Sequence, residues 1–156
     1  MAQETIASRA GWSGGSARVS VVPEVAVRLV GGLLAVAIAA VHIADQGGIT
    51  SLSSPAWMGW GFRLIEAGGV LTALALLVPR PAWLGWAASL LLGVGPFAGY
   101  VASRTVGVPG DPGDVGNWGY WVGTVSLVVE AALVVLSVGM LLALRQHAKA
   151  SSAARR

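Results

Sequence analysis

Four apolar segments, each near the length of a helix that crosses a membrane, make up most of this 156-residue sequence. They lie at about 25–43, 56–78, 81–102 and 118–144. A helix needs about 20 apolar residues to cross a hydrocarbon core of about 30 Å. Hydrophobic residues form 55% of the chain and charged residues 11%, whereas a soluble domain has about 25% charged residues. The sequence therefore predicts an all-α polytopic membrane protein, with a bundle of four transmembrane helices at 25–144.

Turn and cap residues mark the ends of these segments. Asp45 and the Gln-Gly-Gly that follows it end the first segment, and Pro55 precedes the second at a position typical of a helix start. A Pro-Arg-Pro connection between the second and third segments is short enough to require antiparallel neighbours. Residues 1–24 lack the apolar run of a signal peptide and are expected to form a disordered tail. Residues 145–156 are expected to form a basic tail.

The positions of Lys and Arg predict the orientation. Eight of the ten lie before or at the start of the first segment, in the Pro-Arg-Pro connection, or after the fourth segment. Because cytoplasmic flanks retain positive charge, both termini are expected in the cytoplasm and the two longer connections outside. The expected location is the cytoplasmic (plasma) membrane. Two aromatic belts are expected at the headgroup levels. The outer belt would contain Trp57, Trp60, Trp118, Tyr120 and Trp121, and the inner one Trp83 and Trp86.

Arg63, Glu66 and Glu130 are ionisable residues deep inside the apolar segments, where a charge is costly and normally marks a paired or functional group. A rise of about 1.5 Å per residue places Arg63 about 9 Å deep, Glu66 about 14 Å and Glu130 about 18 Å. With only Arg63 near two carboxyls, one carboxyl is expected to be protonated or to bind a cation. Alternatively, Arg63 and Glu66 only neutralise each other. Glu130 would then be neutral and hydrogen-bonded to Thr124, Ser126 or a neighbouring helix.

His42 lies near the end of the first segment, three residues before Asp45, whose carboxylate could orient the imidazole. The other histidine, His147, lies in the C-terminal segment, which argues against a bis-histidine haem. The chain has no Cys and no Glu-x-x-His pair, which argues against iron–sulfur, thiolate and di-iron sites. No cofactor is expected, and no metal beyond a carboxylate–histidine site.

The connection at 103–118 is dense in Gly and Pro, which predicts tight turns. Its polar residues recur every three positions, unlike the ligands of an EF-hand loop. We expect an ordered cap rather than a cation site, with side chains bonded to backbone amides. Arg104 is expected to bind a carboxylate of this cap. The cap residues are Asp111, Asp114, Asn117 and Trp118.

Three stretches, VHIADQGGI, GYVASRTVGVPG and DVGNWGYWVGTVSLVVE, resemble small four-helix integral membrane proteins of actinobacteria. The resemblance covers most of residues 25–140. It implies a membrane location and a four-helix fold, but no activity, because none is assigned to these proteins. The residues that recur in these proteins are called the marked positions here. They correspond to His42, Ser103, Arg104, Gly107, Pro109, Gly110, Trp118, Gly123, Ser126 and Glu130.

Two functions remain open. The first is a non-enzymatic accessory or partner-binding subunit whose buried charges hold the helix register. The second is a carrier or sensor for a proton, cation or small polar ligand that enters from outside. Its polar funnel would contain His42, Asp45, Arg104, Arg63, Glu66 and Glu130.

The sequence also bears on catalysis and partners. A membrane redox enzyme is a distant third reading, because no motif of a conventional enzyme occurs. The expected partner is the lipid bilayer, with a membrane protein or a second copy as further candidates. The net charge of +3 arises from the tails, so no nucleic acid is expected.

Overall fold

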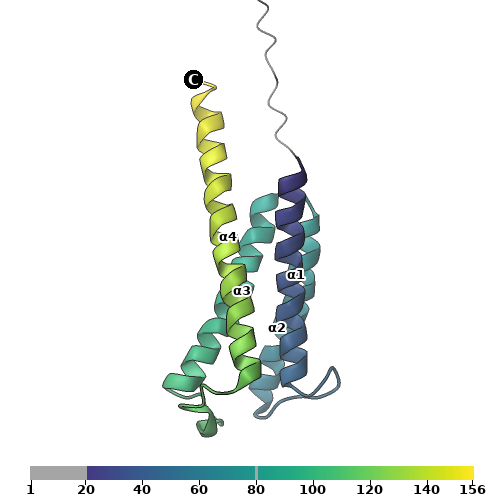
Figure 1. The fold of residues 1–156 in the computed structure, drawn as a ribbon, viewed down its shortest axis with the longest axis vertical. Helices are drawn as coiled ribbons and strands as arrows, with labels where there is room; N and C mark the ends of the chain where they lie inside the picture. Colours follow the sequence, from purple (N-terminus) through teal and green to yellow (C-terminus); the bar gives the residue numbers. More distant parts are fainter. Residues whose placement is uncertain (1–20, 80) are drawn as a thin grey trace, which may run out of the picture.

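The computed structural model of the chain describes residues 21–79 and 81–156. These residues form an antiparallel bundle of four α-helices (Figure 1), which confirms the all-α prediction. The connections after α1 and α3 lie at one end of the bundle, here called the two-loop end. The α2–α3 connection, the start of α1 and the C-terminus lie at the other, here called the terminal end. The elements are α1 (Val21–Asp45), α2 (Ala56–Leu77), α3 (Ala82–Thr105), the short 3-10 helix η1 (Pro112–Asp114) and α4 (Trp121–Ala153).

The helices are longer than the apolar segments that predict them, except for α2, which ends one residue before the expected 78. The largest difference is in α4, which begins at Trp121 and continues to Ala153, nine residues beyond the expected end at 144. The segment expected as a basic tail is therefore mostly helical, since its Ala, Gln, Lys and Arg residues favour a helix without being apolar. Residues 1–20 of the expected N-terminal tail and Arg80 lie outside the described residues.

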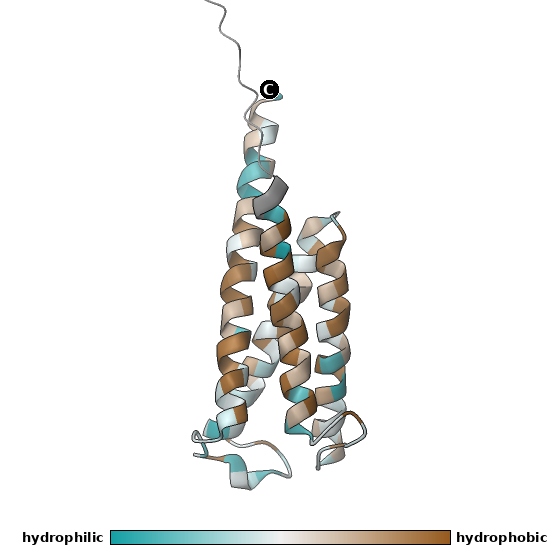
Figure 2. Ribbon diagram, turned by 45° about the vertical axis from the view of Figure 1, so that its right-hand side comes forward, coloured by the Kyte–Doolittle hydropathy of each residue, from teal (hydrophilic) through white to brown (hydrophobic). Residues whose placement is uncertain are grey.

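All four helices are long and apolar enough to cross a membrane. Each exposes a large aliphatic side chain that a water-soluble bundle would bury: Leu33 is 70% exposed, Leu64 75%, Leu91 74% and Val135 73%. Figure 2 shows hydrophobic residues along the middle of the helices and hydrophilic ones at the two-loop end and on the protruding part of α4. Soluble proteins rarely expose a continuous apolar surface of this extent. The bundle is therefore compatible with a multi-pass membrane protein.

The interior is unusually polar. Among the described residues, eleven polar or charged side chains are buried against eight hydrophobic ones. Two of the polar ones, Ser89 and Ser137, donate to carbonyls one turn back in their own helices, which satisfies their hydroxyls locally. The apolar core is small and lies at mid-height, between the ends of the bundle. It contains Ala35, Ile38, Leu92 and Leu133.

Glycines set the closest helix contacts, as expected for helices that associate in lipid. A Cβ atom at Gly69 of α2 would lie 2.6 Å from the carbonyl oxygen of Ala35 in α1. One at Gly93 of α3 would lie 3.0 Å from the carbonyl oxygen of Glu130 in α4. The bundle is thus built from two tightly packed pairs, α1 with α2 and α3 with α4.

At the terminal end, Arg28 of α1 binds the C-terminal end of α2. Its guanidinium donates to the carbonyl oxygens of Leu76, Val78 and Pro79 at 3.0–3.2 Å and pairs with Glu24 at 2.9 Å. The last carbonyls of a helix have no partner within the helix, so this side chain supplies what α2 lacks. In the sequence, the charge of Arg28 indicates only the orientation of the helices and does not predict this contact.

Trp86 does not belong to an inner aromatic belt, and this prediction is wrong. Its side chain is fully buried, whereas Trp83 is 56% exposed. Gly31 of α1 makes the burial possible, because a Cβ there would lie 3.0 Å from the Trp86 ring. The Trp86 indole therefore fills the space beside α1 that exists because Gly31 has no side chain.

Helices α2 and α3 diverge toward the two-loop end (Figure 1). Near the terminal end they are close, since a Cβ at Gly85 would lie 3.3 Å from the carbonyl oxygen of Ala75. Farther along, a Cβ at Gly61, Gly95 or Gly99 would meet no atom within 4 Å. The space that opens between the two helices holds the candidate site.

Candidate functional site

A cavity of about 590 Å³ occupies the space between the two helix pairs. It is called the main cavity here. All four helices line it, from Asp114 and Tyr120 at the two-loop end down to Thr72 of α2 and Ala88 of α3. Most of its wall is apolar, with polar groups gathered toward the two-loop end. Such a cavity is typical of a small-molecule site, which combines apolar walls with a few placed polar groups.

A second cavity of about 330 Å³, here called the vestibule, adjoins the main cavity at the two-loop end. The connection 106–120 and the end of the 46–55 connection contribute to its wall. The two cavities have six lining residues in common, so they adjoin, and together they are called the hollow here. The shared residues are Asp45, Met58, Phe62, Arg104, Asp114 and Tyr120.

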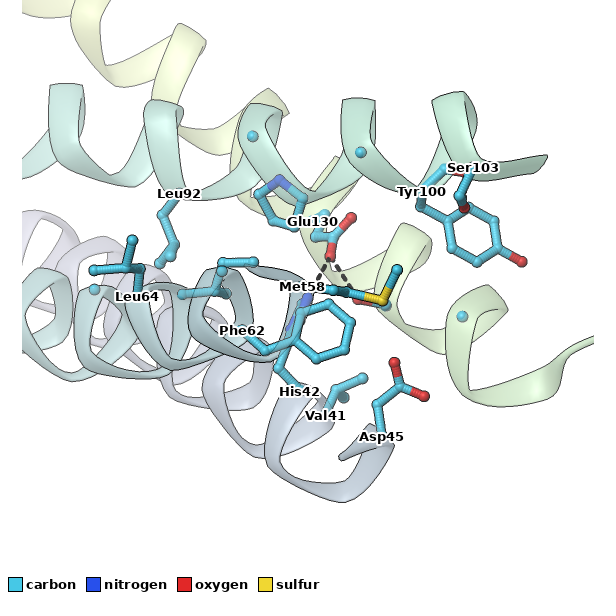
Figure 3. Close-up of a pocket in the computed structure, with 18 of the residues that line it drawn as sticks. Val41, His42, Asp45, Met58, Phe62, Leu64, Leu92, Tyr100, Ser103 and Glu130 are labelled. Atoms are coloured by element: carbon cyan, nitrogen blue, oxygen red, sulfur yellow. Dashed lines mark hydrogen bonds and ion pairs between the residues drawn. The ribbon is translucent and has the colours of Figure 1, made fainter. Parts of the chain in front are cut away.

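His42 and Glu130 face each other across the main cavity wall. Figure 3 shows the two side chains pointing toward one another from α1 and α4. His42 Nε2 lies 4.0 Å from Glu130 Oε1, and the side chains are 8% and 1% exposed. His42 Nδ1 lies 2.9 Å from the carbonyl oxygen of Ile38, and Ser126 Oγ donates to Glu130 Oε1 at 2.5 Å. The hydrogen bond between Ser126 and Glu130, expected in the alternative in which Arg63 and Glu66 neutralise each other, is thus present.

The pair is held on its other side by an aromatic ring. Phe62 of α2 meets the imidazole edge to face, with ring centroids 5.2 Å apart. The imidazole is therefore held between the backbone of α1 and α2, and its Nε2 edge is directed at the carboxyl. This arrangement presents a fixed acid–base pair to the cavity.

Unpaired polar atoms gather at this cavity. Among the described residues, four buried side-chain atoms have no hydrogen-bond partner within the protein. Three of them, Tyr100 Oη, Arg104 Nε and Glu130 Oε2, belong to residues that line the main cavity. The fourth is the indole nitrogen of Trp86. Because an unpaired buried polar group is costly, their concentration beside one cavity distinguishes it as the candidate site.

Arg104 binds the cap as predicted, through Asp114. The two side chains form an ion pair, and the guanidinium lies 4.5 Å from the ring centre of Tyr100. The carbonyl oxygen of Arg104 also accepts the N–H of Gly116 at 2.9 Å. Asp111 is not paired with Arg104. The pKa of Asp111 is raised above its ordinary value, mainly by burial and to a lesser extent by the nearby Asp114 carboxylate.

The other cap residues order the connection 106–120. The N–H of Asn117 donates to the carbonyl oxygen of Asp114 at 3.1 Å, and the ring of Trp118 packs edge-on against Tyr100 at 6.1 Å. Trp57 of α2 donates to the carbonyl oxygen of Pro109 at 3.2 Å, so the connection is also attached to the other helix pair. The expected ordered turns are therefore present. The expected bonds from cap side chains to backbone amides are not, because Asp114 pairs with Arg104 instead and Asp111 makes no side-chain cap bond.

Asp45 does not orient His42, so that expectation is wrong. The last residue of α1 instead accepts a 2.6 Å hydrogen bond from the hydroxyl of Tyr120, which precedes α4. The hydrogen bond, and then burial, raises the pKa of Tyr120 to about 12. Asp45 and Tyr120 both line the hollow where the main cavity meets the vestibule.

Arg63 and Glu66 form the expected ion pair at 2.5 Å, but neither residue lines the main cavity or the vestibule. Glu66 also accepts a 2.6 Å hydrogen bond from Gln46, and Arg63 donates to the carbonyl oxygens of Gly48 and Ser51. These bonds fasten the 46–55 connection to α2. The expectation that Arg63 faces both carboxyls is therefore wrong, because the partners of Glu130 are on α1 and α4.

Sequence reasoning missed three contributors to these networks. Gln46 links Glu66 to the N–H of Ser53, with an Oε1 to nitrogen distance of 3.2 Å. Phe62 packs on His42, and Tyr100 underlies Arg104. Only Tyr100 carried a sequence signal, since it lies one helical turn before Arg104 and thus on the same face.

The described residues contain no group of three or more His, Asp or Glu side chains placed to hold a metal ion. Comparison with protein-family models, curated proteins and solved structures finds no match. The resemblance to actinobacterial four-helix proteins therefore stays a prediction. Six of its ten marked positions line the main cavity: His42, Ser103, Arg104, Gly123, Ser126 and Glu130.

Proposed function

We propose that this protein is a carrier or sensor of the cytoplasmic membrane that binds a small ligand in the main cavity. The observation that carries the proposal is the buried His42–Glu130 pair on the wall of the main cavity, which the vestibule adjoins. An accessory subunit that used buried charges only to hold helix register would pair them in a filled core. Here Glu130 keeps one oxygen unpaired beside the hollow.

The direction of access follows from the charges at the two ends. The terminal end holds Arg28 and the four Lys and Arg residues of segment 145–156, whereas the two-loop end holds Asp45, Asp111 and Asp114. Positive flanks favour the cytoplasmic side. We therefore infer that both termini are cytoplasmic and that the vestibule opens to the outside.

Single-cysteine labelling tests this proposal, because the chain has no native Cys to remove. Gly99→Cys places a thiol on the main cavity wall at a position where a Cβ meets no atom within 4 Å. Val128→Cys is the matched control, because Val128 is 66% exposed on α4 and does not line either cavity. Both positions lie about 10 Å from the two-loop ends of their helices.

A membrane-impermeant, charged methanethiosulfonate added to intact cells should label Gly99→Cys and leave Val128→Cys unlabelled. Only the thiolate reacts, and a thiol in hydrocarbon does not ionise. Labelling of both variants after denaturation shows that both are present. An unreactive Gly99→Cys, in cells and in detergent alike, would contradict a water-filled hollow and favour the accessory subunit.

A further inference from the structure

The main cavity has an excess of acidic groups. Its ionisable lining residues include Asp45, Asp114 and Glu130, against Arg104 and His42. Arg104 and Asp114 neutralise each other as an ion pair. Asp45 has a neutral donor, the Tyr120 hydroxyl, and Glu130 has Ser126 and the imidazole. A bound positive charge would therefore be attracted here, whereas an anion would meet two uncompensated carboxyls.

Glu130 offers a specific contact for such a charge. Its Oε1 is engaged by Ser126, whereas Oε2 is buried and has no partner within the protein. Tyr100 Oη, on the facing helix α3, is also unpaired and can accept a hydrogen bond. A cationic group in the cavity would be attracted to the Glu130 carboxylate, whereas Tyr100 Oη lies beside Gly123, about two helical turns nearer the two-loop end.

The rest of the wall is apolar and reaches the side of the bundle. Leu64 of α2 and Leu91 of α3 line the main cavity although both are about three-quarters exposed. About one helical turn from these leucines, Gly61 of α2 and Gly95 of α3 place no side chain across the gap. The cavity therefore opens sideways between α2 and α3, onto the surface that would face the lipid tails.

The side chains that line the main cavity suit an organic cation better than a hydrated metal ion. A hydrated divalent ion needs several oxygen ligands, and the described residues contain no cluster of three acidic or histidine side chains. An organic cation needs one carboxylate, and it also gains from aromatic faces and apolar walls. Phe62 and Trp57 supply aromatic rings to this cavity.

We propose that the ligand of the main cavity is an amphipathic organic cation. Its charged group binds at Glu130, and its apolar part lies in the opening between α2 and α3. This inference rests on the proposed function and specifies the ligand class of that site. Entry from the lipid side and entry through the vestibule both lead to the same contact.

Three phenyl-substituted probes test the inference on the purified full-length protein in lipid nanodiscs. They are tetraphenylphosphonium, its anionic counterpart tetraphenylborate, and the neutral triphenylphosphine oxide, which has one ring fewer. Empty nanodiscs correct for partitioning into lipid. Binding is followed by equilibrium dialysis. We expect saturable binding of the phosphonium, at least about tenfold weaker binding of the neutral probe, and none of the borate.

Two variants locate the contact. Glu130→Gln keeps the size and hydrogen bonding of the side chain but removes its charge, and should weaken phosphonium binding by about tenfold or more. Glu66→Gln makes the same change at a carboxyl outside both cavities and should leave binding unchanged. If Glu130→Gln does not fold, phosphonium should still slow labelling of Gly99→Cys, while borate should not.

The outcomes separate the two proposals. Equal binding of the cation and the neutral probe, or binding of the borate, overturns the cation assignment but leaves a ligand-binding cavity. Absence of saturable phosphonium binding also overturns the assignment, and Gly99→Cys labelling then decides whether the proposed function survives.

Discussion

The hydroxyl of Tyr120 lies 2.6 Å from Oδ1 of Asp45, so the residue before α4 is hydrogen-bonded to the last residue of α1. The two residues are 75 positions apart in the chain. Their bond joins the α1–α2 pair to the α3–α4 pair at the two-loop end. It also lies on the wall where the main cavity and the vestibule meet.

This hydrogen bond predicts that the stability of the folded protein falls at alkaline pH. The pKa of Tyr120 is raised from 10.0 to about 12 in the folded protein, so the protonated hydroxyl favours the folded state. Its contribution is complete below about pH 10 and is lost as the pH rises toward 12. The melting temperature should therefore fall more between these pH values in the parent protein than in Tyr120→Phe. Equal falls in both proteins would show that the bond contributes nothing.

Arg104→Ala should destabilise the protein by about 2 kcal/mol and make the 106–120 connection sensitive to protease. The change removes the ion pair to Asp114 and the contact with the Tyr100 ring. Thermal unfolding and limited proteolysis of the purified protein measure the two effects. Arg145→Ala, on the exposed part of α4, is the control and should behave like the parent. A protease-resistant Arg104→Ala would contradict the cap role.

Glu130→Gln and Glu130→Ala should differ in stability. The glutamine variant retains a partner for Ser126 and should unfold within about 1 kcal/mol of the parent. The alanine variant loses that bond and enlarges the cavity, which should cost about 2–3 kcal/mol. Chemical unfolding in mild detergent compares them. If both variants were equally destabilised, charge at Glu130 would be needed for folding itself.

Gly69→Ala should loosen the α1–α2 pair. The added methyl group would lie 2.6 Å from the carbonyl oxygen of Ala35, which is backbone and cannot rotate away. Overpacking of this kind costs about 1–3 kcal/mol. Gly95→Ala adds the same group where no atom lies within 4 Å and should leave the melting temperature unchanged. A Gly69→Ala protein as stable as Gly95→Ala would rule out a tight contact.

Reporter fusions check the proposed orientation. Fusions after Gly48 and after Gly113 should report an external location, and a fusion at the C-terminus an internal one. The reason is that Lys and Arg gather at the terminal end. An external C-terminus would reverse the orientation and place the vestibule on the cytoplasmic side.

The sequence predicted the features that depend on local chemistry. Pro55 and the Pro-Arg-Pro connection delimit α2 to within one residue, because proline constrains the backbone on either side of it. The Arg63–Glu66 pair follows from helical spacing. The Arg104–Asp114 pair could be predicted because both residues lie in the same short connection and carry opposite charges. In each case the partners are close in the chain or share one loop.

What the sequence did not predict depends on which helix faces meet. Glu66 and Glu130 have similar calculated depths, yet they face different neighbours, because depth along a helix says nothing of rotation about it. Trp86 is buried only because Gly31 of another helix faces it. Arg28 reaches carbonyls about 50 positions away in the chain. The main cavity exists because α2 and α3 diverge. Glycines in a sequence allow two helices to diverge in this way, but they do not show that the helices do so.

The hydrogen bonds from Arg28 to the end of α2 have a consequence for how the bundle is held together around the main cavity. They join α1 to the end of α2 at the terminal end, while the Tyr120–Asp45 and Trp57–Pro109 hydrogen bonds join the two helix pairs at the two-loop end. The main cavity therefore lies between two sets of cross-links, and loss of one set would leave the helices joined at the other.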